Sequence, residues 1–165
     1  MDSNRGVEDV RRAKGSNRIQ INNILAAACI AILSVLLGLS GKQFSNWMVM
    51  QLAAATPLLV TSSLAYAKIS YRDPREYPVW DGLGWVTLSL GYIMLLNALA
   101  IMLCTSGYPT VSWCFISVAV LLFVAYSMLD VKANKKNLRE KGRKLGFYLA
   151  LMFLGAILPI LAGWV

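Results

Sequence analysis

The side chains best suited to acid–base chemistry are four carboxylates between the long apolar runs: Asp73, Glu76, Asp81 and Asp130. Nothing beyond their number pairs any two of them, and the chain has no histidine to act beside them. The metalloprotease, nucleophile-elbow and phosphate-loop motifs are missing as well. Three cysteines without paired spacing predict buried thiols rather than a metal cage. We therefore expect no enzymatic activity, no cofactor and no metal.

Uncharged polar side chains inside the apolar runs could bind or conduct instead. Gln51 lies four residues from the start of the run at 47–67, and Asn97 lies six residues from the end of the run at 83–103. At a rise of 1.5 Å per residue these depths are about 6 and 9 Å, a layer that Pro159 shares. Because amides in hydrocarbon seek partners, this layer predicts either a Gln51–Asn97 clasp between helices or a polar constriction in a pore. The candidate pore lining or polar core consists of Gln51, Thr56, Pro57, Thr61, Ser62 and Asn97.

Long uncharged segments must position these side chains. Four windows contain no Asp, Glu, Lys or Arg, namely 19–41, 43–67, 82–129 and 145–165, and the third is long enough for two spans and a turn. About 20 apolar residues in a helix cross the hydrocarbon core, where each span must satisfy its own backbone hydrogen bonds. The sequence therefore predicts an all-α, polytopic membrane helix bundle with five transmembrane helices. The predicted spans are 19–39, 47–67, 83–103, 108–128 and 145–164, which form a single domain at 19–165 after a polar, basic tail at 1–18.

The basic residues alternate from side to side along these five spans. Fifteen of the 16 Lys and Arg residues fall in the tail, in the second connection or in the fourth connection. The first connection holds Lys42, and the third connection and the carboxyl end hold none. Because cytoplasmic loops retain Lys and Arg, the pattern predicts a cytoplasmic N-terminus, an outside C-terminus and a place in the plasma membrane.

The second connection, YRDPREYPVWDGLGW at 71–85, is unusually rich in charged and aromatic residues. Its tyrosines and tryptophans suit the headgroup level, where one edge of the ring is apolar and the other is hydrated. Pro74 and Pro78 should keep a helix from running through it. Asp81 is the residue type expected at the N-cap of the third span. These features predict an interfacial anchor, although the same charges could form a partner site.

Small residues on the third and fifth spans predict close helix packing. Those of the third span recur at spacings that place them on one helix face, and those of the fifth span begin with an i, i+4 pair, where their small size lets two backbones approach. The candidate packing residues are Gly84, Thr87, Gly91, Ala98, Gly146, Ala150 and Gly155.

Three functional hypotheses remain. The first is a homo-oligomeric membrane protein that forms a pore or channel, in which the small-residue faces are buried between subunits. The second is an anchoring or sensing subunit that binds an acidic protein or anionic lipid through its basic cytoplasmic face. The third and weakest is a transporter of a small lipophilic substrate. The candidate contact residues of the basic face are Arg72, Arg75, Lys135, Lys136 and Arg139. Without aromatic interleaving or a known motif, this charge does not indicate nucleic-acid binding.

Overall fold

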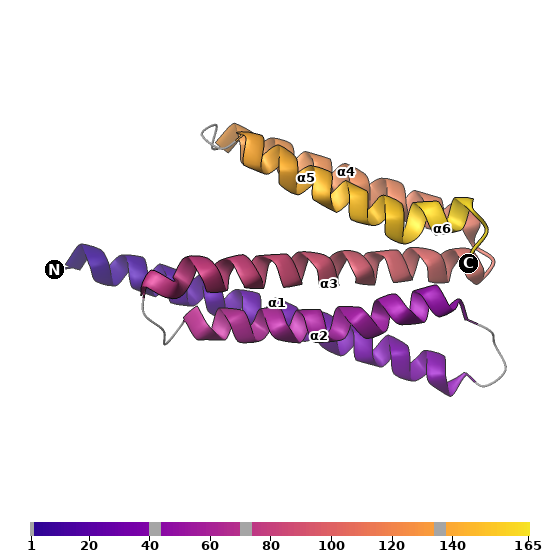
Figure 1. Ribbon diagram of the computed structural model, residues 1–165, viewed down its shortest axis with the longest axis horizontal. Helices are drawn as coiled ribbons and strands as arrows, with labels where there is room; N and C mark the ends of the chain where they lie inside the picture. Colours follow the sequence, from indigo (N-terminus) through magenta and orange to yellow (C-terminus); the bar gives the residue numbers. More distant parts are fainter. Residues whose placement is uncertain (1, 40–43, 70–73, 134–137) are drawn as a thin grey trace. The chain divides into compact units, whose positions relative to one another are not determined.

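The structure is a computed structural model that describes residues 2–39, 44–69, 74–133 and 138–165, nearly all of them helical (Figure 1). The first half of the chain holds α1 (Asp2–Gly38), α2 (Asn46–Ile69), the 3₁₀ turn η1 (Pro74–Glu76) and α3 (Tyr77–Thr105). The second half holds α4 (Pro109–Ala133), α5 (Leu138–Met152), the π-helical turn η3 (Phe153–Ile157) and α6 (Leu158–Leu161). The backbone stays helical from α5 through η3 into α6, so these three elements form one continuous helix.

Five helical stretches are long and apolar enough to cross a membrane. They cover Gly15–Gly38, Asn46–Ile69, Tyr77–Thr105, Pro109–Leu129 and Arg139–Leu161, with 21 to 29 residues each. A span needs about 20 residues. The prediction of an all-helical protein with five such helices is confirmed, and the chain has the make-up of an integral, multi-pass membrane protein.

The chain divides into two compact units. The first unit comprises Met1–Ser40 with Leu52–Tyr92, and the second comprises Gly41–Gln51 with Ile93–Val165. Both α2 and α3 therefore pass from one unit into the other.

In the first unit, glycines on α3 allow that helix to lie against α2. A Cβ at Gly91 would lie 2.9 Å from Leu59 Cγ and 3.1 Å from the Ala55 carbonyl oxygen. A Cβ at Gly84 would lie 2.8 Å from Cζ of the buried Tyr66 ring. A larger side chain at Gly91 would press on the α2 backbone, and one at Gly84 would displace the Tyr66 ring, so the small-residue pattern has a direct packing consequence here.

In the second unit, α4 runs beside the continuous helix formed by α5, η3 and α6 (Figure 1). Phe123 on α4 stacks on Tyr148 of α5, with 5.3 Å between ring centroids. The helix end before α4 is closed by Gly107, whose φ of 91° is a conformation that glycine adopts without a Cβ clash. The adjacent N–H groups of Gly107 and Tyr108 bond back to the carbonyls of Cys104 and Leu103.

Two helix starts differ from the expectations drawn from the sequence. The third helix begins at Tyr77, so Asp81 lies inside α3 and the prediction that it caps this helix is wrong. Pro78 falls in the first turn, where a helix does not need a backbone donor, and therefore does not end the helix. The first helix begins at Asp2, so the segment predicted as a tail continues the first span as a helix.

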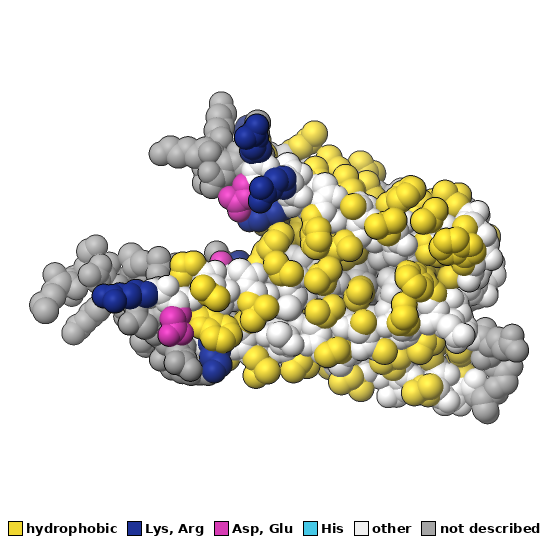
Figure 2. Space-filling view, in the orientation of Figure 1, with side chains coloured by type: hydrophobic (Ala, Val, Ile, Leu, Met, Phe, Trp, Pro, Cys, Tyr) yellow, Lys and Arg dark blue, Asp and Glu magenta, His cyan; other side chains and the backbone are white. Residues whose placement is uncertain are grey.

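Charged and apolar side chains are separated along each unit. Figure 2 shows Lys, Arg, Asp and Glu gathered at one end of each unit, while the visible remainder is largely apolar. Large apolar side chains such as Leu121 and Leu122 on α4 are exposed. Such surfaces suit contact with lipid, which is the solvent that a spanning helix meets.

Candidate functional site

A proline in the fifth span leaves a carbonyl oxygen without its usual helical donor. In an α-helix the N–H of residue 159 would donate to the carbonyl oxygen of residue 155, but Pro159 has no N–H. Two side chains from the start of α2 donate to the Gly155 oxygen instead. The indole Nε1 of Trp47 and the amide Nε2 of Gln51 each lie 2.8 Å from it. We call this arrangement, together with Asn97, the clasp.

Asn97 of α3 contacts the same stretch of the fifth span. Its Nδ2 donates to the Leu151 carbonyl oxygen at 3.2 Å. Gly155 lies against the two amides, because a Cβ there would overlap the Asn97 amide nitrogen and lie 3.2 Å from Gln51 Oε1. Asn97 Oδ1 is buried and has no hydrogen-bond partner among the described residues. The clasp therefore depends on glycine at position 155.

The π-helical turn η3 coincides with this contact. The Leu158 N–H donates to the Phe153 carbonyl five residues earlier, which widens the helix at 153–157. Such turns commonly accompany a disturbed hydrogen-bond ladder, and here the disturbance is Pro159 together with inserted side-chain donors.

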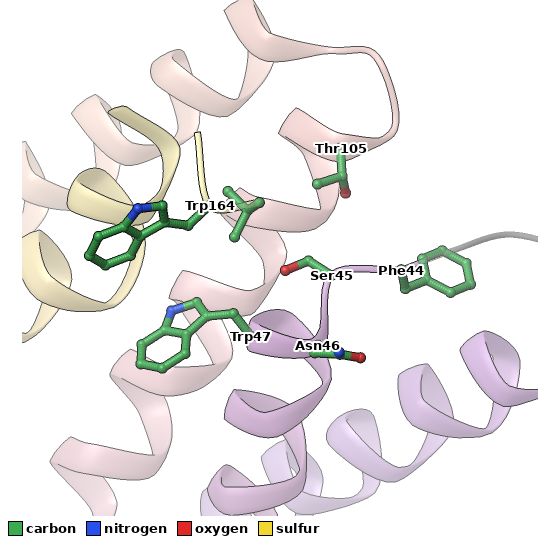
Figure 3. Close-up of a pocket in the computed structure, with 7 residues that line it drawn as sticks. Phe44, Ser45, Asn46, Trp47, Thr105 and Trp164 are labelled. Carbon is green, nitrogen blue, oxygen red and sulfur yellow. The ribbon is translucent and has the colours of Figure 1, made fainter. Parts of the chain in front are cut away.

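A hollow of about 520 Å³ lies beside the clasp, at the end of α6. Its lining side chains are uncharged. They come from residues before and within the start of α2, from the end of α3 and from the last two residues: Phe44, Ser45, Asn46, Trp47, Thr105, Trp164 and Val165. Figure 3 shows the indoles of Trp47 and Trp164 on the same side of the hollow and the Ser45 hydroxyl turned toward them. Phe44 and Asn46 point away from the indoles. Trp47 thus belongs to both the clasp and the hollow.

Local backbone chemistry positions Trp164. Gly163 has φ of 65°, and its N–H bonds to the Ile160 carbonyl oxygen at 3.3 Å. The Trp164 N–H bonds to the Pro159 carbonyl oxygen at 3.0 Å. These two bonds are the Schellman ending of a helix, and they turn the chain so that Trp164 folds back beside α6. At the start of α2, the backbone of Ser45 is held by the first bond of the helix, because its carbonyl oxygen accepts the Val49 N–H at 3.2 Å.

A second polar cluster joins three helices within the first unit. Asn22 Nδ2 on α1 donates to Ser62 Oγ on α2 at 2.8 Å, and Ser62 Oγ donates to the Gly84 carbonyl oxygen on α3 at 2.7 Å. Ser63 Oγ also donates to Asn23 Oδ1 at 2.9 Å. Asn22 is fully buried, and its Oδ1 has no hydrogen-bond partner in the described part of the chain.

Arg18 lies near the same junction and joins α1 to both other helices. Its guanidinium is 2.7 Å from Asp81 Oδ1, and its Cζ lies 4.7 Å from the centre of the Tyr66 ring. A planar guanidinium can form an ion pair and stack on an aromatic ring at once. Inside α3, Asp81 thus contributes an ion pair to α1 rather than a helix cap.

The candidate lining residues fall into different environments. Gln51 and Asn97 are buried in the second unit, where both donate to the fifth span. Ser62 is buried in the first unit, whereas Pro57 and Thr61 are exposed. Thr56 is partly buried and donates to the Leu52 carbonyl oxygen of its own helix at 3.2 Å. That these residues line a pore stays a prediction.

The candidate packing residues also differ. Gly84, Thr87, Gly91 and Ala98 are buried, and Gly155 touches the clasp. Thr87 Oγ1 donates to the Leu83 carbonyl oxygen at 2.8 Å. Gly146 and Ala150 are exposed, and a Cβ at Gly146 would meet no atom within 4 Å in the described structure.

The basic candidates are described only in part. Arg75 and Arg139 are exposed, whereas Arg72, Lys135 and Lys136 lie outside the described residues. Two further cations, Lys132 and Arg143, are exposed near Arg139. Within the described ranges, no three Cys, Asp and Glu side chains lie close enough together to hold a metal ion.

Sequence reasoning missed several residues that the structure brings into polar contacts. Asn22 and Asn23 are amides inside a predicted span, the same signal that singled out Gln51 and Asn97. Trp47 stands at the start of a predicted span, and its bond to Gly155 depends on the rotation of the helix about its axis, for which the sequence gives no signal. Comparison of the chain with protein-family models, curated proteins and solved structures gives no match.

Proposed function

We propose that this protein is an integral, multi-pass membrane protein that binds anionic lipid headgroups through its basic end. The basic end is defined as Lys132, Arg139 and Arg143, which lie at the facing ends of α4 and α5. The observation that carries the proposal is the exposure of all three cations directly beside apolar membrane-spanning surface.

The local charge balance at the basic end favours an anionic ligand. Segment 131–144 contains seven Lys and Arg residues against one acid, Glu140. That carboxylate is already engaged, because Glu140 Oε1 lies 2.7 Å from Lys144 Nζ on the same helix. Figure 2 shows the resulting group of basic side chains at this end of the second unit.

The position of these cations along the helices suits the headgroup layer. The exposed side chains Met128 and Leu129 lie four and three residues before Lys132, and the exposed Phe147 lies four residues after Arg143. At 1.5 Å per residue, about 5–6 Å separates the apolar surface from each cation. Long basic side chains at such a boundary extend their charges to the lipid phosphates, and each contributes about 1 kcal/mol of attraction.

The pore hypothesis has less support from the side-chain contacts. Gln51, Ser62 and Asn97 are buried, and their donors bond to backbone carbonyls of neighbouring helices, which is the pattern of side chains that hold helices together. The exposed part of α2 around Thr61 includes the apolar side chains Val60 and Leu64. This mixture suits lipid or another helix better than a continuous polar conduit.

Lipid selectivity tests the proposal directly. The purified protein is titrated with phosphatidylglycerol or with phosphatidylcholine of the same acyl chains, and bound lipid is counted by native mass spectrometry. The triple variant Lys132→Gln, Arg139→Gln, Arg143→Gln should lose at least about tenfold of its preference for the anionic lipid at low salt. The preference of the unaltered protein should also weaken as salt increases, because ions screen exposed charges.

A charge-conserving variant separates lipid binding from folding. Lys132→Arg, Arg139→Lys, Arg143→Lys keeps every charge while it changes the same three side chains, and it should retain the preference. Equal anionic-lipid binding by the neutral and the charge-conserving variants would show that the basic end is not the binding surface.

A further inference from the structure

We propose that the hollow beside the clasp binds the quaternary ammonium group of a choline-type lipid headgroup. The two indoles of Trp47 and Trp164 would contact the cation, and the Ser45 hydroxyl would donate to the adjoining phosphate. The hollow lies at the end of α6, whereas Arg139 and Arg143 of the basic end lie in the first turns of α5, so the two sites are at opposite ends of one continuous helix.

The indoles of Trp47 and Trp164 lie on the same side of the hollow, and both residues are exposed (Figure 3). Trp47 is 39% exposed and Trp164 is 71% exposed, so both residues can be reached from outside the protein. The hydrogen bond from Trp47 Nε1 to the Gly155 carbonyl oxygen holds the Trp47 ring. The Schellman turn at Gly163 sets the position of the Trp164 backbone. Figure 3 shows both rings on the same side of the hollow, with Ser45 turned toward them. Indole faces attract cations that approach within about 6 Å of the ring centre.

The lining selects against other headgroup chemistries. No side chain among the seven lining residues is acidic or basic. A primary ammonium has three N–H groups that would lose water on entry, whereas a quaternary ammonium has none. Quaternary cations held on aromatic rings are therefore the chemistry that this lining matches best.

The surroundings of the hollow point to a lipid rather than to a soluble choline compound. Leu154 and Leu161, on the helix that leads to Trp164, are 57% and 66% exposed. They form an apolar surface along the same helix, on which acyl chains could lie while the headgroup enters the hollow. A volume of about 520 Å³ is ample for a headgroup.

Substitution of Trp164 provides the test, because its side chain takes no part in the clasp bonds. Native mass spectrometry measures the dissociation constants of phosphatidylcholine and phosphatidylethanolamine with matched acyl chains. A parallel titration uses free phosphocholine. The unaltered protein should prefer phosphatidylcholine to phosphatidylethanolamine, and Trp164→Leu should weaken phosphatidylcholine binding about fivefold. Trp164→Phe, which keeps an aromatic face, should weaken it less.

Two controls make the result specific. Trp113→Leu removes another exposed tryptophan that does not line the hollow, and it should leave the phosphatidylcholine affinity unchanged. The neutral triple variant of the basic end should also keep this affinity. Equal binding of the two zwitterionic lipids, or equal losses in Trp164→Leu and Trp113→Leu, would overturn the proposal. Tighter binding of free phosphocholine than of the lipid would overturn the lipid as the ligand.

Discussion

At the scale of single residues, the clasp shows how a missing backbone donor creates a binding position for side chains. The Gly155 carbonyl oxygen has no α-helical donor because residue 159 is proline, and Trp47 and Gln51 take the donor's place. A buried carbonyl without any partner in hydrocarbon would cost several kcal/mol. The side-chain donors of Trp47 and Gln51 therefore compensate for the backbone donor that Pro159 lacks.

Gly155→Ala should destabilise the protein by about 1–3 kcal/mol, because the added methyl group would overlap the Asn97 amide and force the helices apart. Gly146→Ala is the matched control on the same span. Its Cβ meets no described atom within 4 Å, so the higher helix propensity of alanine should leave stability unchanged or raise it by up to about 1 kcal/mol. Unfolding in detergent, followed by circular dichroism, measures both. Equal effects of the two substitutions would contradict the close contact at Gly155.

The sequence predicted the layer in which these residues meet, but not their partners. Counting 1.5 Å per residue places Gln51, Asn97 and Pro159 at similar depth. Which carbonyls of the fifth span accept these donors depends on the rotation of each helix about its axis. The long segments without charged residues contain no signal for that rotation. The exposed neighbour Thr61 and the buried Ser62 were predicted together for the same reason.

At the scale of whole elements, the five spans were predictable because hydrocarbon imposes length and apolarity on every helix that crosses it. The starts of α1 and α3 were not. Pro78 fits within the first turn of α3, and the polar residues before Ile19 continue the helix, so both helices extend beyond their apolar parts. Composition locates a span, whereas the helix end depends on local backbone bonds.

Ser62→Ala should loosen the junction of α1, α2 and α3 by about 1–2 kcal/mol. The serine hydroxyl accepts from Asn22 and donates to the Gly84 carbonyl, so its removal takes away both interhelical bonds and leaves the buried Asn22 amide without this acceptor. The neighbouring exposed residue provides the comparison, and Thr61→Ala should change stability by less than about 0.5 kcal/mol. Denaturation in mixed detergent micelles reports the difference. A loss in Thr61→Ala as large as that in Ser62→Ala would refute a specific role for this hydrogen-bonded chain.

At the scale of the whole molecule, the distribution of Lys and Arg predicts which ends of the helices face the cytoplasm. Fifteen of the 16 basic residues lie in segments that an odd number of spans assigns to one side. The basic end and the tryptophan-lined hollow would then meet opposite leaflets. Each proposed site would encounter a different lipid population.

Cysteine labelling tests this topology. After Cys29, Cys104 and Cys114 are replaced by alanine, a single cysteine is introduced by Ser3→Cys or by Ser106→Cys in the turn between α3 and α4. A membrane-impermeant maleimide should label the first variant only from the cytoplasmic face and the second only from the outer face. Labelling of both variants from one face would refute the five-span arrangement.

The proline-made acceptor also bears on biogenesis. Trp47 and Gln51 lie 108 and 104 residues before the carbonyl that they bind, so a chain made from its amino end inserts α2 long before its partner exists. Until the fifth helix arrives, both donors lie in the bilayer without that acceptor, and the new helix in turn carries an exposed carbonyl until it docks. Docking of the fifth helix therefore supplies the acceptor for both donors and covers its own carbonyl in the same step.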